Sequence, residues 1–283
     1  AADAFGVPFE FKPRTSISKI IELKTIDNWP AGGVSDDTLL SICTLQTLIH
    51  SEPKVAANKF LELIKKQLPN LRGLGPTTRS ALGLPVKESE KHFIGISNGG
   101  MMRTSLCGLA FHSNEPEKRR EWISAQVIAT HKSEKAIHSA LALSAAFCHS
   151  LENINNINKN SILAYVRQEL LEIDSPYFDI FENFQLSSWE MPNQGISLDP
   201  IETLMAVIWC VSKSGNCFDA IRNACSLGGD TDTVAALSAS LYIVFTGNYE
   251  TFFSLDWTKH VDWNGIPNLD DAIQQLLNRN ETS

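Results

Sequence analysis

The stretch SLGGDTDTVAA, residues 226–236, sets the first constraint on the fold. Two glycines precede Asp230 and Asp232, and the apolar run that follows them predicts a buried helix. Two carboxylates therefore stand at the edge of the core, and no lysine or arginine lies beside them in the sequence. Burying charges is costly unless a partner neutralises them, so the rest of the chain has to provide that partner.

A second stretch, GGVSDDTLLSICTLQTLIH at residues 32–50, repeats the order of glycines, hydroxyl side chains, carboxylates and a buried helix. Ser35, Asp36 and Asp37 stand at the predicted start of that helix. On a regular helix the side chains of residues i and i+2 point about 200° apart, because one turn takes 3.6 residues. Asp230 and Asp232 can therefore converge only if Asp230 lies in the loop before its helix.

Two interpretations of these helix starts remain open. Asp, Ser and Thr are the residues that cap helix N-termini, and capping explains either motif taken alone. Together the motifs offer more oxygen atoms than two caps need, and clustered carboxylates raise one another's pKa unless a cation intervenes. An all-oxygen ligand set suits Mg²⁺, Mn²⁺ or Ca²⁺ and argues against Zn²⁺. The sharper hypothesis is a two-metal site where the two helix starts meet.

Composition excludes several classes of protein. The 283 residues are 43% hydrophobic, and 24 Lys and Arg against 32 Asp and Glu give a net charge of −8. The basic residues are scattered, which argues against nucleic acid as a direct partner. The six cysteines show no C-x-x-C spacing and most stand in apolar helical contexts, which favours a reducing, cytoplasmic setting. No run approaches the ~20 apolar residues that span a bilayer, and no signal peptide is visible at the start, so we expect no membrane contact.

The hydrophobic period is helical along almost the whole chain, as at Ala57, Phe60 and Ile64. The stretch SLDPIETLMAVIWCVSK predicts a helix with Asp199 as its N-cap and a stripe through Met205. Residues 136–151 are apolar or small nearly all round, which predicts a central helix packed on several sides.

Extended alternation is missing apart from HFIGIS at residues 92–97, which is too short to carry a sheet. Residues 152–161 are interpreted as a solvated connection and residues 182–198 as a long surface loop. The opening AADAFG has the character of the middle of an element, so we expect the first helix to be cut short. The prediction is an all-α, single-domain, many-helix globule over residues 1–283, a monomer, with a binuclear metal site at helix N-termini.

Four short motifs resemble, in order and spacing, those of the ADP-ribosylglycohydrolase family. They are SDDT at 35–38, SNGGMMR at 97–103, TH at 130–131 and LGGDTDT at 227–233. The segment DAFGVPFEF at 3–11 is similar to the family's N-terminal GDALGAPFEF, so the resemblance covers nearly the whole chain. The family includes the dinitrogenase reductase-activating glycohydrolases and the mammalian ADP-ribosylhydrolases. Membership implies an all-α fold with two Mg²⁺ or Mn²⁺ ions.

The resemblance also implies a ligand set, carried over position by position. One metal would be held by Ser35, Asp36, Asp37 and Asp232, and the other by Asp230, Asp232 and Thr233, so that Asp232 bridges them. Ser35 stands where the family usually has threonine, a change that keeps the hydroxyl ligand.

Substrate-binding and catalytic residues are implied in the same way. The expected substrate contacts are Asn98, Gly99, Gly100, Met101, His131 and Gly229, and the expected catalytic carboxylates are Glu10, Asp36 and Asp37. Three alternatives stay open. His131 is equally compatible with a hydrogen-bonded core histidine, Glu10 with an exposed loop acid, and Arg103 with a structural ion pair instead of a phosphate contact.

The implied activity is metal-dependent hydrolysis at C1 of the distal ribose, where ADP-ribose joins a protein side chain. The expected partners are thus an ADP-ribosylated protein and ADP-ribose. Two other classes remain: a non-catalytic ADP-ribose-binding pseudoenzyme, and an immunity or regulatory protein that docks on an ADP-ribosylating toxin. An arginine, a serine, an ester or a nucleic-acid end as acceptor is equally compatible with these motifs.

Overall fold

The computed structural model describes residues 1–17, 22–25, 29–50, 52–154, 158–267, 270 and 273–274. In that part of the chain the regular structure is helical, and the only β pairing is two isolated bridges, Gly33 with Asp262 and Ile196 with Gly229. The prediction of an all-α fold is confirmed. None of the described helices has the length and apolar character needed to cross a bilayer.

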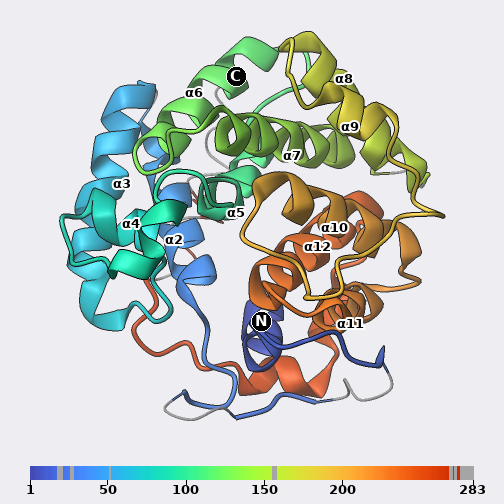
Figure 1. Cartoon of the computed structure of the whole chain (residues 1–283), viewed down its shortest axis with the longest axis horizontal. Helices are drawn as coiled ribbons and strands as arrows, with labels where there is room; N and C mark the ends of the chain where they lie inside the picture. The colour runs from blue at the N-terminus through green and yellow to red at the C-terminus, as the bar shows by residue number, and fades with distance from the viewer. Residues whose placement is uncertain are drawn as a thin grey trace.

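The α-helices vary from single turns to rods of several turns (Figure 1). Their bounds are α1 Ala2–Gly6, α2 Asp36–Leu45, α3 Pro53–Gln67, α4 Pro76–Ala81, α5 Gly99–Thr104, α6 Pro116–Ile128, α7 Glu134–Glu152, α8 Asn160–Glu172, α9 Phe178–Glu182, α10 Pro200–Lys213, α11 Cys217–Leu227, α12 Thr231–Thr246 and α13 Glu250–Phe253. Short 3₁₀ turns join several of them: η1 Val7–Phe9, η3 Gln46–Ile49, η4 Leu68–Asn70, η5 Glu88–Phe93, η6 Ser105–Ala110 and η7 Asp256–His260.

Helix α7 is the centre of the fold, as its composition predicts. It packs against α5, α6, α8, α10 and α12, and its residues from Ala136 to Cys148 are largely buried. Figure 1 shows the blue and cyan helices α2 to α5 on one side of the molecule and the orange helices α10 to α12 on the other, with the green helix α7 above α5, α10 and α12. The starts of α2 and α12, which carry the two acidic motifs, therefore come from different halves of the chain.

The helix signals read from the sequence correspond to real helices. Ala57, Phe60 and Ile64 form the buried face of α3. Asp199 caps α10 by accepting hydrogen bonds from the backbone N–H groups of Ile201 and Glu202, at 2.8 and 3.3 Å. The sequence predicts one apolar stripe on α10, through Met205. In the structure most residues of α10 are buried, and Met205 lies on the side that is only half-buried.

The predicted loops are only partly solvated. Between α9 and α10, Phe184 and Ile196 are buried, so the expected surface loop at 182–198 also contributes to the core. The backbone of Ile196 donates to Gly228 O (2.9 Å) and accepts from Asp230 N (2.8 Å), which ties this loop to the start of α12. In the connection from α7 to α8, residues 155–157 lie outside the described residues.

Close packing of α1 on α12 needs a glycine. The first helix is one short, fully buried element, and Gly6 lies directly against the first turn of α12. A Cβ on Gly6 would stand 2.6 Å from both Asp232 Cα and Thr231 O. The Thr231 hydroxyl also donates to Gly6 O at 2.9 Å, so the backbones of the two helices are joined at this point.

We expect Gly6→Ala to destabilise the protein by about 1–3 kcal/mol, because the added methyl group meets backbone atoms that cannot rotate away. Gly75→Ala is the matched control: Gly75 has φ −65°, ψ 159°, and no atom lies within 4 Å of a Cβ built there. Chemical denaturation of both variants measures the difference. Equal stability of the two variants would contradict this account of the contact.

Candidate functional site

Three backbone segments meet at the glycines before α12. Gly229 N donates to Lys12 O (2.9 Å) and Gly229 O accepts from Phe11 N (2.7 Å), while Ile196 bonds the other edge of the same segment. A Cβ on Gly229 would stand 2.0 Å from Ile196 O, and one on Gly228 would stand 2.4 Å from Lys12 O. Both glycines also have positive φ, 70° and 74°. Only glycine fits here, and the arrangement fixes the backbones that carry Glu10 and Asp230.

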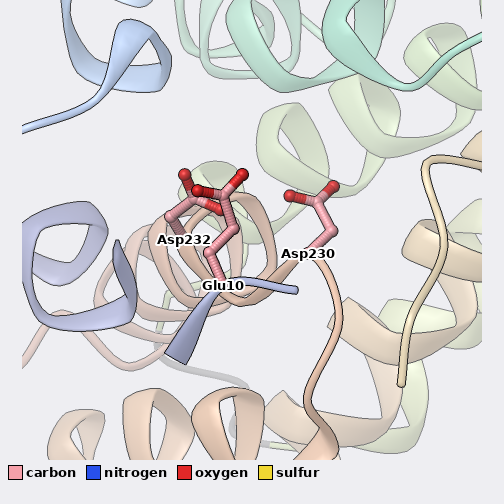
Figure 2. A group of neighbouring side chains, drawn as sticks. All are labelled: Glu10, Asp230 and Asp232. Atoms are coloured by element: carbon pink, nitrogen blue, oxygen red, sulfur yellow. The ribbon is translucent and has the colours of Figure 1, made fainter. Parts of the chain in front are cut away.

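Glu10, Asp230 and Asp232 form a carboxylate triad. One ligand oxygen from each lies within 4.8 Å of the others. Figure 2 shows Glu10 reaching from the N-terminal segment across the first turn of α12, toward the two aspartates. Asp230 lies in the loop, as convergence requires, and makes no side-chain capping hydrogen bond. The capping interpretation is therefore wrong for Asp230.

At the start of α2 the capping interpretation is correct for Ser35. Its hydroxyl accepts from Asp37 N (3.1 Å) and donates to Asp37 Oδ2 (3.0 Å). Asp3, on α1, completes this helix start: its carboxylate accepts from Ser35 N (3.1 Å), Thr38 N (3.2 Å) and the Thr38 hydroxyl (2.5 Å). Asp3 is thus a cap supplied from another helix, and it orients the α2 motif toward α12.

Burial and mutual repulsion raise the pKa of the acidic groups in this cluster. Desolvation is the largest cause for each group, followed for Glu10 by the charges of Asp230 and Asp3, which bring its pKa to about 8. The pKa values of Asp36, Asp37 and Asp232 are raised well above their ordinary range by the same two effects. A hydrogen bond from the Gly75 backbone lowers the pKa of Asp36 only in part.

The residues present fit a bound cation. Asp37 Oδ1 and Asp232 Oδ1 are buried and have no hydrogen-bond partner. Asp230 is positioned by Asn98, whose Nδ2 donates to its carboxylate and, at 2.8 Å, to the Thr203 hydroxyl. Buried acceptors without donors are rare in folded proteins, and a hard divalent cation satisfies oxygen ligands of this kind.

The cluster forms the floor of a cavity of about 580 Å³. Predicted site residues that line it are Glu10, Asp36, Asp37, Asn98, Gly99, His131, Gly229, Asp230, Asp232 and Thr233. Three others are placed elsewhere. Ser35 lies behind the cluster as the α2 cap, Gly100 packs against Val127, and the Met101 side chain is in the hydrophobic core. A ligand contact at 100 or 101 would have to come from the backbone.

The hydrogen bonds that His131 and Arg103 make all go to neutral partners. The His131 ring nitrogens contact the hydroxyls of Ser97 (3.1 Å) and Thr130 (2.8 Å), and burial, with the charge of Arg103, lowers its pKa to about 3. Arg103 is buried, donates to Gln126 O and Thr130 Oγ1 (2.5 and 3.0 Å), and stacks on Phe60. Its bonds are to neutral oxygens, so both the predicted ion pair and a phosphate contact are unsupported for Arg103.

Sequence reasoning missed four features of the site. Asp3 caps α2, Phe11 and the loop 73–75 line the cavity, and Arg79 is the only lysine or arginine among the described lining residues. Arg79 pairs with Glu90 at 2.8 Å, which leaves the floor carboxylates without a cationic partner in the lining. An aspartate inside the apolar AADAFG was the available signal for Asp3. Nothing local marked the others, because their neighbours here come from distant segments.

Comparison with known proteins agrees with this geometry. The family model described as ADP-ribosylglycohydrolase matches residues 1–282. The uncharacterized protein YegU of Escherichia coli is 22% identical over 84% of this chain and 82% of that protein. The ADP-ribosylarginine hydrolase Tri1 of Pseudomonas putida is 25% identical over 92% of this chain and 72% of that protein. A solved structure titled ADP-ribosylglycohydrolase-related protein complex aligns with a TM-score of 0.71 at 21% identity, covering 100% of this chain and 94% of its own.

The chain therefore belongs to the ADP-ribosylglycohydrolase family. The family assignment supports ADP-ribose removal as the general activity and metal dependence as a general property, and the acidic triad is consistent with the second.

The raised pKa values predict the effect of Asp232→Asn in excess chelator. A carboxyl group whose folded-state pKa is raised stabilises the protein fully only below its unfolded-state pKa, and that contribution is lost as pH rises toward the folded-state value. Replacing Asp232 removes one repelled charge, so the variant's melting temperature should exceed that of the wild type by a growing margin as pH rises above the ordinary pKa of an aspartate. Each unit of raised pKa corresponds to about 1.4 kcal/mol.

With Mg²⁺ in place of chelator, the wild type should have the higher melting temperature. Only the wild type keeps all the carboxylates that bind the ion, and binding stabilises the folded state. Glu169→Gln is the control, since Glu169 is equally buried but is paired with Arg119 at 2.7 Å. It should destabilise by about 3–5 kcal/mol with or without metal. A lower melting temperature for Asp232→Asn in chelator at high pH would refute the account of uncompensated charge.

Proposed function

We propose that this protein is a metal-dependent hydrolase that removes ADP-ribose from a modified protein side chain by cleavage at C1 of the distal ribose. One observation carries the proposal: buried carboxylates with unpartnered oxygens form the floor of a cavity whose volume suits a nucleotide-sized ligand. Family membership supports the reaction class.

Two Mg²⁺ or Mn²⁺ ions would be held by the carboxylates of both motifs. The proposed ligands are Ser35, Asp36, Asp37 and Asp232 for one ion and Asp230, Asp232 and Thr233 for the other. Glu10 would also lie near the second ion, because it forms the triad with Asp230 and Asp232. Ser35 can keep donating its hydroxyl proton to the Asp37 carboxylate while a lone pair of the same oxygen ligates.

Bound cations of this kind polarise coordinated hydroxyl groups and water. In the reaction the bond from ribose C1 to the acceptor atom breaks, a water oxygen bonds to C1, and the released acceptor takes up a proton. Glu10 is suited to moving that proton, because its half-buried carboxyl group lies in the triad at the cavity and is not a proposed ligand of either ion. Asp36 and Asp37 line the same cavity and would stabilise the positive charge that develops on the sugar.

The remaining lining residues hold the ligand in this proposal. Gly99 offers backbone at the cavity wall, and Asn98 acts by fixing the Asp230 carboxylate. His131 lines the same wall. Because its pKa is lowered, its ring is neutral and would contact the ligand through hydrogen bonds and not as a cation.

A non-catalytic ADP-ribose binder and a toxin-docking immunity protein are the competing proposals. A binder would be favoured by a missing metal ligand, and every proposed ligand is present in the sequence. The name of the Pseudomonas relative makes an arginine linkage the first acceptor to test. A cytoplasmic location belongs to the same proposal and is supported by six buried cysteines without C-x-x-C spacing. We also propose that the protein acts as a monomer.

We expect release of ADP-ribose from a modified protein to stop in excess EDTA and to return with Mg²⁺ or Mn²⁺ but not with Zn²⁺. The physical reason is the all-oxygen ligand set. A chromatographic assay of released ADP-ribose measures this. Full activity in EDTA would exclude the two-metal proposal.

Free ADP-ribose should stabilise the folded protein in the presence of Mg²⁺. At a hundredfold excess over Kd the gain is about 2.7 kcal/mol, which corresponds to several degrees in melting temperature. AMP should produce much less, because it lacks the distal ribose, and Asp232→Asn should lose the metal-dependent part of the shift. A wild-type shift without hydrolysis of any modified protein would favour the binder, and no shift at all would favour the docking protein.

A further inference from the structure

Phe11 has a backbone conformation that phenylalanine rarely adopts. Its φ is 53°, and among the described non-glycine residues only Asp174 (φ 48°) shares a positive value. In this region the Cβ crowds the following carbonyl, so glycine, asparagine and aspartate are the usual occupants. A bulky aromatic residue is conspicuous here, and such outliers cluster at binding and catalytic sites.

The backbone bonds around Phe11 explain the turn but not the side chain. Phe11 N donates to Gly229 O (2.7 Å), and Lys12 N donates to Phe9 O (3.2 Å), which closes the turn that brings Glu10 over the first turn of α12. Glycine would make the same bonds with less strain. Phe11 as a whole is 70% exposed, so it adds little to the core.

The position of Phe11 indicates a role in ligand binding and not in packing of the core. Phe11 lines the main cavity, and it directly follows Glu10, a member of the carboxylate triad. It therefore lies at the cavity next in sequence to the carboxylate to which the proposed function assigns proton transfer. The lining carries Glu10, Asp36, Asp37, Glu90, Asp230 and Asp232 against one arginine, Arg79, which is already paired with Glu90.

An exposed aromatic residue beside Glu10, a carboxylate that is not among the ligands proposed for either ion, is suited to a flat cation. A guanidinium group stacks on aromatic rings and is weakly hydrated, whereas a hydroxyl or an ester gains little from the ring face. We propose that Phe11 is a specificity-determining residue that stacks on the guanidinium of an ADP-ribosylated arginine side chain. This inference rests on the proposed hydrolase function and adds the residue that selects the acceptor.

The test compares two linkages on the same peptide, ADP-ribosyl-arginine and ADP-ribosyl-serine, with Mg²⁺ present. Phe11→Gly should lower kcat/KM for the arginine-linked peptide by about fivefold or more, the size of a partly desolvated cation–aromatic contact, and leave the serine-linked peptide within about twofold. Phe11→Tyr keeps both the ring and the strained backbone and should retain the arginine preference. The Kd for free ADP-ribose, measured by calorimetry, should be unchanged in both variants.

Asp174→Gly is the matched control, because it relieves the other strained residue on the exposed end of α8 and should leave both activities unchanged. Equal losses on both linkages, or weaker binding of free ADP-ribose by Phe11→Gly, would show that the ring contacts ADP-ribose and would overturn the inference. So would a fully active Phe11→Gly. A wild type that releases no ADP-ribose from either peptide overturns the proposed function itself, which separates the two failures.

Discussion

Electrostatic repulsion among buried carboxylates is the constraint on which the site depends. Elsewhere this chain compensates buried acids: Glu169, between α6 and α8, receives Arg119 at 2.7 Å and Arg120 at 3.0 Å. At the meeting point of α2 and α12 the described part of the chain supplies no such partner, and two carboxylate oxygens there have no hydrogen bond. The folding energy of the surrounding helices therefore has to hold the acids together, and the cluster is prepared for a positive ligand.

Close backbone contacts supply the rigidity that this requires. Gly6 lets α1 touch the first turn of α12, and Gly228 and Gly229 admit the segments around Lys12 and Ile196 on either side. Because each contact joins backbone to backbone, the carboxylates move only if whole segments move. A side chain in place of any of these glycines would collide with backbone atoms, so these positions cannot supply a basic group that relieves the repulsion among the carboxylates. The folded protein is less stable for this repulsion, a cost that is common at binding sites.

The helices and most of the candidate site could be predicted from local signals. The Asp199 cap, the apolar period of α3 and the small-residue surface of α7 each depend on neighbours within a few residues, and each prediction is confirmed. The loop at 182–198 was predicted less well, because the buried position of Ile196 results from pairing with Gly228 and Asp230. Asp3 was missed for a similar reason: it caps α2, a helix that begins more than thirty residues later.

By itself, the sequence determined the helical class and the two acidic helix starts, and it predicted which oxygen side chains could hold a metal, because periodicity, capping and donor chemistry are properties of short segments. The tertiary structure alone decided that Glu10 joins Asp230 and Asp232, that Ser35 serves mainly as a cap, and that Arg103 binds neutral oxygens. It also decided that Phe11 stands exposed at the cavity. Each of these depends on which distant segments pack together, and that follows from the shape of the core, which no local pattern specifies.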